Sequence, residues 1–421
     1  LKPCGLKPDL WSRSPRGPMS RSCDLEWCAK ECFEFEDLAF WHGKESGVPF
    51  GDAARAVDVI VAGPHASAAY PEELRPFVSE ALTRRKQFDY SDVSTKALGR
   101  KWAEIDPHVV FIENPYARWL FDPNRATPTE AAVARSRVGD LRALYSRRSL
   151  VRKLAPMCCC PGSMWNSLAF RGVDVVRPVT FAGEDVLREP ETEEQWAALE
   201  GALLRAAQRG PGRYQQALEE AVDAVLAARG ASGAGAGGRL CFISLHDTCN
   251  QQVRAEDGAI VRERRGIERY PRIVNFGNVG NGYGDGNCCF AQSCCGAARL
   301  GCDLLMLAKG RGRPLSTPGP RMRAIAAAWA TAFGCQAEDA EQWARSLGDA
   351  PAAAAHAHDF SFNRPSLGVQ ETFSWSEHFR QRGCDVDVFQ VEFERAQLVG
   401  SQAAAAFKLP GASWPPEDFP E

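Results

Sequence analysis

The chain has 421 residues, of which 45% are hydrophobic and 24% are charged. This is the composition of an ordinary globular protein, and no apolar run reaches the about 18 residues of a transmembrane helix, so we expect no membrane span. A formal net charge of −3, with no long run of Lys and Arg, argues against nucleic acid as a partner. The chain begins with Leu1; the compartment stays open, with the cytoplasm favoured, and so does the oligomeric state.

The first fifty residues contain Pro, Gly, Cys and Trp without periodicity, which predicts an irregular N-terminal extension over 1–50. Regular patterning then indicates one domain over 51–405, followed by a C-terminal tail over 406–421. The domain opens with the β-branched strand pattern "VDVIVAG" and with "PEELRPFVSEALTRR", which has acidic residues early and basic residues late, as the dipole of a helix favours.

Further apolar bursts of strand length follow in "HVVFIE" and "RWLFD". Residues 191–210 and 213–230 space Ala, Leu and Val three and four apart, which predicts two helices separated by Gly210-Pro211-Gly212. The glycine-rich run at 230–238 is typical of a surface loop.

The remaining pattern predicts strands at 240–245, 272–276 and 386–394 and a helix at 321–334. This alternation of strands and helices predicts an α/β fold with a mixed, mostly parallel central sheet flanked by helices. The glycine-rich "NFGNVGNGYGDGN" lacks both the frame of a dinucleotide site and the Lys-Ser/Thr of a phosphate loop, so we do not predict nucleotide binding.

Sixteen cysteines are many for a cytosolic enzyme, and several lie in clusters such as Cys158–Cys160. The clusters lack the paired Cys-x-x-Cys spacing of a zinc ribbon. We therefore interpret them as scattered reduced thiols, with a redox or metal-storage role as the weaker alternative.

Two of the seven histidines, His65 and His246, come at or just after predicted strands. In open α/β sheets ligands bind beyond the carboxyl ends of the strands, so both imidazoles are candidates to converge on a metal ion. A hydrolytic zinc site also needs a third ligand, usually a carboxylate, and an open position for water. Asp89 and Asp92 are best placed in chain order, with Glu72 and Glu73 as alternatives.

The segment "ARWLFDPNRAT" gathers Arg118, Asp122, Asn124 and Arg125, a set suited to holding a carboxylate or to a surface salt bridge. In "DVFQVEFERAQL", alternation puts Val388, Gln390, Glu392 and Glu394 on one face of a strand. A carboxylate in a partly dry site is suited to act as a general base, and Glu392 is the candidate; pairing with Arg395 or Arg125 is the alternative.

Four of these segments, in order, resemble the N-formylglutamate amidohydrolase family, which is related to the zinc carboxypeptidases. "GPHASAAYPEEL" is similar to its Pro-His-Ser-Gly segment, "ARWLFDPNRAT" to its Arg-Tyr-x-x-Asp-x-Asn-Arg segment, "LCFISLHDTCN" to its Leu-x-Asp-x-His-Ser segment and "VFQVEFERAQL" to its Ile-Gln-Ile-Glu-x-x-Arg segment. The resemblance covers residues 57 to about 400 and implies a zinc-carboxypeptidase-like, phosphorylase/hydrolase-like architecture.

The resemblance also implies roles for individual residues. His65, Asp92 and His246 would bind one Zn²⁺ ion, Glu392 would activate water, and Arg118 would polarise the scissile carbonyl. Asn124 and Arg125 would grip the carboxylate of the substrate. The implied activity is cleavage of the amide of a small N-acyl amino acid, with N-formyl-L-glutamate as the family's substrate.

The chain departs from the family pattern beside both histidines. Ala66-Ser67 replaces Ser-Gly after His65, and the second segment reads Ser244-Leu245-His246-Asp247. A His-x-x-Glu ligand pair would need glutamate at Ala68, so that arrangement is excluded. Two alternatives therefore remain: a carboxypeptidase or deacylase with a different substrate, and a non-catalytic binding protein that keeps the fold.

Overall fold

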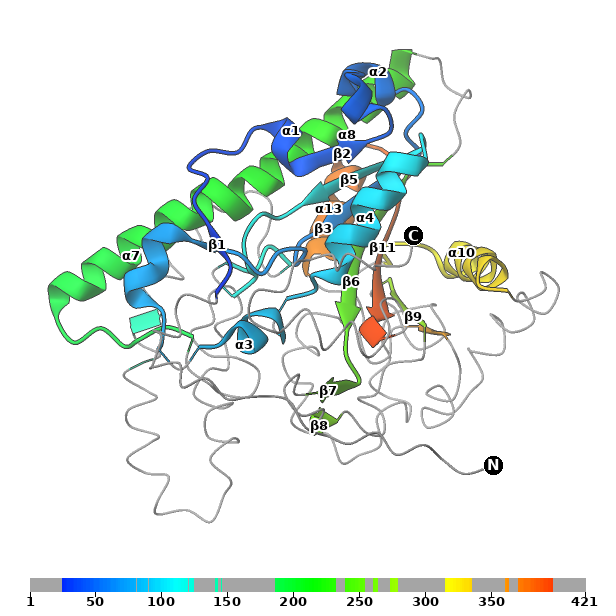
Figure 1. Ribbon diagram of the computed structural model, residues 1–421. Helices are drawn as coiled ribbons and strands as arrows, with labels where there is room; N and C mark the ends of the chain where they lie inside the picture. The colour runs from blue at the N-terminus through cyan, green and yellow to red at the C-terminus, as the bar shows by residue number, and fades with distance from the viewer. Residues whose placement is uncertain are drawn as a thin grey trace, which may run out of the picture.

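The computed structural model describes residues 25–80, 82–89, 91–119, 121–124, 141–142, 145, 186–231, 239–253, 260–263, 273–278, 315–334, 360–362 and 370–396. Over these ranges the chain folds around a seven-stranded sheet (Figure 1). From one edge to the other its strands are β10 (Phe360–Phe362), β9 (Val274–Gly277), β11 (Asp387–Glu394), β6 (Cys241–Thr248), β3 (Val59–Gly63), β5 (Val109–Glu113) and β2 (Ala39–Trp41).

The four central strands β11, β6, β3 and β5 are all parallel to one another. On either side of them β9 runs antiparallel to β11 and β2 antiparallel to β5, while β10 is parallel to β9. The predicted α/β fold with a mixed, mostly parallel sheet is thus confirmed. The carboxyl ends of the central strands meet at one edge of the sheet, which is where α/β folds place their ligand sites.

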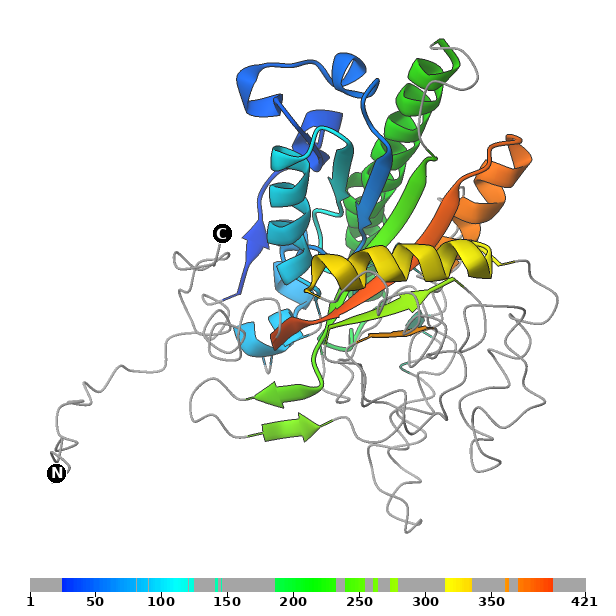
Figure 2. The ribbon, with the colours of Figure 1, turned by 90° about the vertical axis from the view of Figure 1, so that its right-hand side faces the viewer.

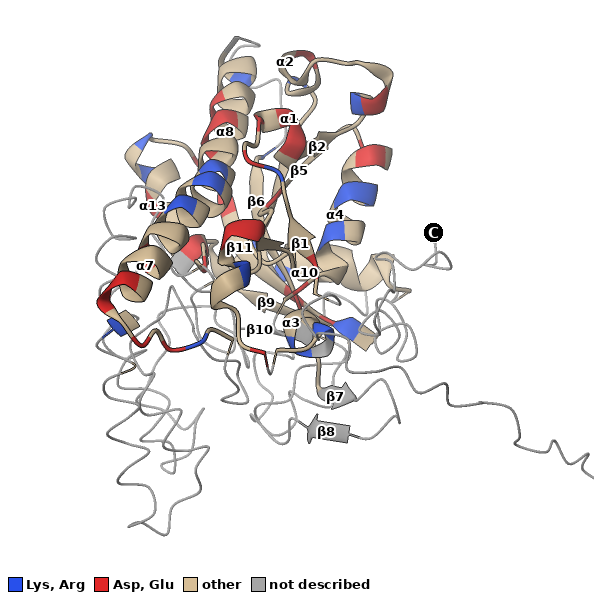
Figure 3. Cartoon of the chain, turned by 60° about the vertical axis from the view of Figure 1, so that its left-hand side comes forward, with Lys and Arg blue, Asp and Glu red and all other residues tan. Residues whose placement is uncertain are grey.

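Helices cover both faces of this sheet (Figure 2). Those on one face are α1 (Phe35–Leu38), α7 (Glu193–Ala207), α8 (Arg213–Ala231) and α13 (Gln370–Gln381), and those on the other are α4 (Ser94–Ile105) and α10 (Gly319–Ala332). Strand alternation divides the core between them: in β3, Ile60 and Ala62 pack towards α8 and α13, whereas Val61 packs towards α4 and α10. Charged residues occur along α4, α7 and α8 (Figure 3).

The remaining elements are short. They are β1 (Trp27–Cys28) paired with β4 (Tyr70–Pro71), the hairpin of β7 (Gln251–Val253) and β8 (Ile260–Glu263), the 3-10 helices η2 (Lys44–Ser46) and η3 (Glu72–Phe77), the π-helical turn η5 (Gln208–Gly212), and the helices α2 (Phe50–Ala53) and α3 (Arg84–Asp89). No helix within the described ranges is long and apolar enough to cross a bilayer.

Residues 25–50, which we predicted to be part of an irregular extension, contribute to the main domain. Strand β2 is an edge strand of the central sheet, and Leu38 and Trp41 are buried in the core. The sequence pattern missed this because β2 has only three residues and α1 only four, too few to show a period. Residues 1–24 and 406–421 lie outside the described residues.

Two other predicted elements differ from the structure. The helix expected at 71–85 is split into η3 and α3, and Pro76 lies inside η3, where a proline does not allow an α-helix to continue. The strand expected at "RWLFD" is absent from its described residues, which lie in a turn. In contrast, the helices predicted at 191–210 and 213–230 are confirmed, with the π-helical η5 joining them. The predicted loop at 230–238 lies mostly outside the described residues.

Candidate metal centre

Three segments far apart in sequence bring His65, Asp92 and His246 together at the carboxyl ends of β3 and β6. His65 follows β3 by two residues, and its backbone carbonyl accepts a hydrogen bond of 2.9 Å from the N–H of Asp92, in the turn before α4. His246 lies inside β6 rather than after it, because the strand extends to Thr248, three residues beyond its predicted end. The adjoining parallel pairing of β3 and β6 places the two imidazoles side by side.

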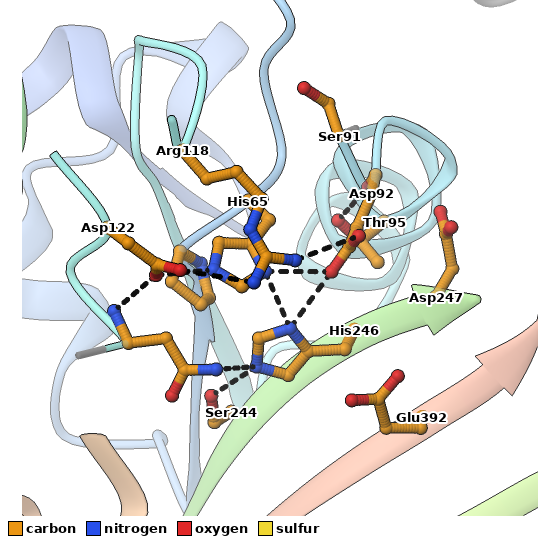
Figure 4. A network of polar contacts seen from close by, with 12 residues as sticks. His65, Ser91, Asp92, Thr95, Arg118, Asp122, Ser244, His246, Asp247 and Glu392 are labelled. Atoms are coloured by element: carbon orange, nitrogen blue, oxygen red, sulfur yellow. Dashed lines mark hydrogen bonds and ion pairs between the residues drawn. The ribbon is translucent and has the colours of Figure 1, made fainter. Parts of the chain in front are cut away.

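The ligand atoms of these residues converge on one point (Figure 4). Asp92 Oδ2 lies 2.9 Å from Nδ1 of His65 and 2.9 Å from Nδ1 of His246, and the two Nδ1 atoms are 3.0 Å apart. All three side chains are buried. Within the described part of the chain, this is the group of His, Cys, Asp and Glu side chains arranged closely enough to hold a metal ion.

This geometry fits a zinc ion. Ligand atoms bound tetrahedrally at roughly 2.0–2.1 Å lie about 3.4 Å from one another, so the three side chains would need to open by only a few tenths of an ångström. Two imidazoles and one carboxylate are also a usual donor set for catalytic zinc, which keeps a further position open. Three acceptor atoms buried this close repel one another unless a proton or a cation lies between them.

The ring nitrogens that point away from this centre are hydrogen-bonded as well. Nε2 of His65 lies 2.8 Å from Asp122 Oδ1, and Nε2 of His246 lies 2.9 Å from Ser244 Oγ and 3.3 Å from Asn124 Nδ2. Histidines that bind a metal almost always use their second nitrogen in this way, because the bond fixes the ring and its tautomer. Asp122 was in the segment noted from the sequence, but its contact with His65 was not predicted.

Arg118 lies between the carboxylates of Asp122 and Asp92. Its Nη2 donates to Asp122 Oδ2 over 3.1 Å, and Nη1 is 3.8 Å from Asp92 Oδ1. Its side chain is 10% exposed. In this structure Arg118 therefore stabilises the carboxylates around His65, and its predicted role at the scissile carbonyl stays a prediction.

The buried charges shift the pKa values of the three candidate ligands in different directions. Burial and Arg118 lower the pKa of His65, but Asp122 and Asp92 outweigh them and raise it overall. Burial lowers the pKa of His246 to about 4, against the hydrogen bond of Asp92. Burial raises the pKa of Asp92, yet the charge of His65 and the hydrogen bonds of both imidazoles hold it well below its usual range.

The alternative third ligands are placed differently. Glu72 forms an ion pair with Arg75 in which both side chains are 43% exposed, and Glu73 is paired with Arg209. Asp89 is the last residue of α3, and its side chain lies outside the described residues. Among the four carboxylates considered from the sequence, Asp92 is therefore the one that the described structure brings to both histidines.

Of the two residues predicted to bind the substrate carboxylate, Asn124 lies within the described residues. Asn124 is buried, and its backbone N–H donates to Asp122 Oδ1 over 3.0 Å. Its side-chain Oδ1 has no hydrogen-bond partner among the described residues. Arg125 lies outside the described residues.

Glu392 lies on β11 in register with His246 on β6, so the two side chains project from the same face of the sheet (Figure 4). The predicted alternation of β11 is confirmed, since Val388 packs on the α8 and α13 side and Phe389, Val391 and Phe393 pack on the other. Glu392 is half-buried, and its Oε1 accepts a hydrogen bond of 2.6 Å from Gln390 Nε2. Its position beside His246 is compatible with the predicted general base.

Behind the candidate centre, Arg395 and Asp247 form an ion pair that is almost fully buried. Arg395 Nε donates to Asp247 Oδ1 over 2.6 Å, and Nη2 also reaches the backbone carbonyl of Ser91. Asp247 Oδ2 accepts a 3.1 Å hydrogen bond from the backbone N–H of Ser94, the first residue of α4. Burial raises the pKa of Asp247 to about 6, against the attraction of Arg395. The pair thus ties the end of β11 to the turn that carries Asp92.

Replacing Arg395 with methionine is expected to lower the free energy of unfolding by about 3–5 kcal/mol at pH 8, because it leaves Asp247 as a buried charge without its counterion. Denaturant titration of the purified variant measures this loss. Lys101→Met is the control, since Lys101 and Glu104 pair on the surface with side chains 53% and 63% exposed. An equal, small loss in both variants would contradict the account.

Glu371 is a buried residue of the first turn of α13 that the sequence did not mark as functional. Its Oε1 accepts a hydrogen bond of 2.9 Å from Tyr214 Oη on α8, and its Oε2 accepts one from Ser244 Oγ on β6. Burial raises its pKa to about 7, while the hydroxyl groups of Ser244 and Tyr214 and the charge of His65 act to lower it and Asp122 acts to raise it. An acidic residue at a helix start is usually explained by the helix dipole, so no sequence signal distinguished it.

The raised pKa of Glu371 predicts a stability that depends on pH. Because the native state binds the proton more tightly than the unfolded state, the carboxyl's contribution is complete below about pH 4.5 and is lost as the pH rises through about 7. Relative to Glu371→Gln, the wild-type protein should lose about 3 kcal/mol over this interval. Chemical denaturation at several pH values measures the difference, and a difference that is constant with pH would contradict the prediction.

The comparisons with known proteins agree with the sequence motifs. Residues 57–233 match the N-formylglutamate amidohydrolase family. The predicted resemblance is thereby confirmed over this part of the chain, which contains His65, Asp92, Arg118, Asn124 and Arg125 and ends before His246 and Glu392. The match supports a hydrolase that acts on amide bonds.

Two solved structures are similar to the chain at low identity. One is the gene product Atu2144 from Agrobacterium tumefaciens, 13% identical, with a TM-score of 0.36 over 90% of this chain and 94% of that one. The other is N-formylglutamate amidohydrolase from Ralstonia eutropha JMP134, also 13% identical with a TM-score of 0.36, over 82% of this chain and 83% of that one. No curated protein matches the chain.

Proposed function

We propose that this protein is a zinc-dependent amidohydrolase that cleaves the amide of a small N-acyl amino acid, with N-formyl-L-glutamate as the substrate to test first. The observation that carries the proposal is the convergence of His65 Nδ1, His246 Nδ1 and Asp92 Oδ2 within 3.0 Å of one another, in a chain whose residues 57–233 match an amidohydrolase family. His65, Asp92 and His246 would hold the metal.

A zinc ion bound by these residues supplies a Lewis acid that polarises the amide carbonyl and lowers the pKa of water. Glu392, beside His246, takes the proton from the attacking water and returns it to the nitrogen of the leaving amine. Asp122 holds His65 through Nε2, so that its Nδ1 stays directed at the centre. Asn124 and Arg125 would bind the carboxylate of the substrate, as the family resemblance implies.

The test is release of formate from N-formyl-L-glutamate by the zinc-loaded protein, with N-acetyl-L-glutamate and a dipeptide with a C-terminal glutamate assayed in parallel. We expect formate release that is lost after treatment with a chelator and restored by zinc. Cleavage of either other substrate instead would indicate a deacylase or a carboxypeptidase. No cleavage of the three substrates by protein that binds zinc would contradict the proposed substrate class and favour a binding protein that keeps the fold.

A further inference from the structure

A chain of hydrogen bonds joins His246 to a carboxylate outside the candidate metal centre. It runs from His246 Nε2 to Ser244 Oγ, two residues earlier on the same face of β6, and from Ser244 Oγ to Glu371 Oε2 on α13. Tyr214 Oη occupies the other oxygen, Oε1. All four residues are buried, and Glu371 is 3% exposed, so bulk water does not compete for these bonds.

The direction of the chain follows from its donors and acceptors. Above about pH 7, where Glu371 is ionised, its carboxylate accepts hydrogen bonds at both oxygens and donates none, so Tyr214 and Ser244 both donate to it. Ser244 has a single hydroxyl hydrogen. Once that hydrogen points to Glu371, Ser244 Oγ has only its lone pairs to offer to His246, and the hydrogen in this bond must be on Nε2.

A neutral imidazole with its hydrogen on Nε2 carries a lone pair on Nδ1. Nδ1 is the atom of His246 that lies 2.9 Å from Asp92 Oδ2 and 3.0 Å from Nδ1 of His65. The hydrogen-bond chain therefore presents the lone pair of His246 to the place where the three candidate ligand atoms meet.

We propose that Glu371 is a positioning residue that acts through Ser244 to fix the metal-binding tautomer of His246. The inference rests on the metal centre proposed above and adds to it two residues from outside the 57–233 family match. Glu371 does not touch the metal or the substrate in this account; it sets which nitrogen of His246 carries the hydrogen.

The amide of Asn124 is compatible with this tautomer. Its nitrogen lies 3.3 Å from His246 Nε2, and its oxygen is the buried acceptor without a partner among the described residues. If the amide is turned over, Oδ1 of Asn124 lies against Nε2 of His246 and accepts a hydrogen bond from its N–H. Among the described residues, Nδ2 makes no other hydrogen bond that this turn would break.

Glu371→Gln tests which groups donate in this series of hydrogen bonds, because the side chain keeps almost the same shape. Glutamine offers one acceptor and one donor group, so with Tyr214 donating to its oxygen, its NH₂ group faces Ser244. The hydroxyl hydrogen of Ser244 then turns towards His246 Nε2, and the hydrogen of the imidazole moves to Nδ1. Ser244→Ala removes the connection altogether.

The control is Thr372→Val. Thr372 follows Glu371 in α13, is equally buried, and its hydroxyl has no hydrogen-bond partner among the described residues. The substitution therefore alters a buried side chain of the same helix turn but leaves the hydrogen bonds from Glu371 through Ser244 to His246 unchanged. Circular dichroism and denaturant titration establish that each variant is folded.

The first measurement is the zinc affinity of the full chain, by competition with a chromophoric chelator. We expect Glu371→Gln and Ser244→Ala to bind zinc roughly 10–100-fold more weakly, as loss of an outer partner of a metal-bound histidine does, and Thr372→Val to stay within about twofold of the wild type. Unchanged affinity in both folded test variants would overturn the proposal.

The second measurement is the tautomer of His246 in zinc-free protein labelled with ¹⁵N-histidine, from long-range ¹H–¹⁵N correlation spectra. At pH 8, where Glu371 is ionised, we expect the Nε2–H form in the wild type and in Thr372→Val, and loss of that form in Glu371→Gln. The Nε2–H form persisting in Glu371→Gln would overturn the proposal. Because this measurement needs no zinc, it decides the proposal even if the wild type binds no zinc, a result that would contradict the metal centre itself.

Discussion

Replacing Glu392 with glutamine is expected to lower kcat for amide cleavage by about 10²–10⁴-fold, because glutamine has no basic oxygen to take a proton from water. The side chain stays nearly the same size and can keep a hydrogen bond with Gln390. Since Glu392 is not among the converging ligand atoms, zinc content should not change. Steady-state kinetics together with elemental analysis of the same preparation measure both quantities.

Glu394→Gln is the matched control for Glu392. Glu394 lies two residues further on the same strand and face, and its Oε1 accepts a hydrogen bond from the backbone N–H of Asn250. We expect this variant to keep its kcat within a few-fold, as substitutions outside the reacting groups do. Full activity in Glu392→Gln, or equal losses in the two variants, would exclude Glu392 as the general base.

Replacing Asp92 with asparagine should lower zinc affinity by more than the roughly 10–100-fold that loss of an outer hydrogen-bond partner costs. The reason is that Oδ2 of Asp92 contacts Nδ1 of both histidines and brings the negative charge of the proposed ligand set. Asparagine keeps the shape and removes the charge. Chelator competition measures the change.

The same measurement on Asp89→Asn, Glu72→Gln and Glu73→Gln tests the other carboxylates that the sequence left open. Glu72 is engaged with Arg75 on the surface, and Glu73 with Arg209, so neither substitution should alter zinc affinity. Weakened binding in one of these variants and normal binding in Asp92→Asn would show that the third ligand was assigned wrongly.

The sequence predicted the parts of the fold whose pattern is long and regular. Strands β3, β6, β9 and β11 and helices α7, α8 and α10 all lie where their periodicity indicates. The elements that the sequence pattern missed or misplaced are short or interrupted: β2 has three residues, and Pro76 divides the helix expected at 71–85. Period-based arguments need more residues than such elements contain.

The sequence identified a candidate site residue only where that type of residue is uncommon at the end of an apolar strand. His65 and His246 stood out because histidines are few and both follow apolar strand residues. Ser244 and Glu371 carried no such signal, since a serine within a strand and a glutamate in the first turn of a helix are both common. Their significance comes from a contact across 127 positions of the chain, which only the pairing of β6 with its neighbours and the packing of α13 create.

The most direct test of the account is the zinc content of the full chain after exhaustive dialysis, measured by elemental analysis for the wild type and for the His65→Ala, His246→Ala double variant. If the two imidazoles hold the metal, the wild type retains about one zinc ion per chain and the folded double variant retains none. Stoichiometric zinc in the double variant would contradict the central claim, because the metal would then be held somewhere else.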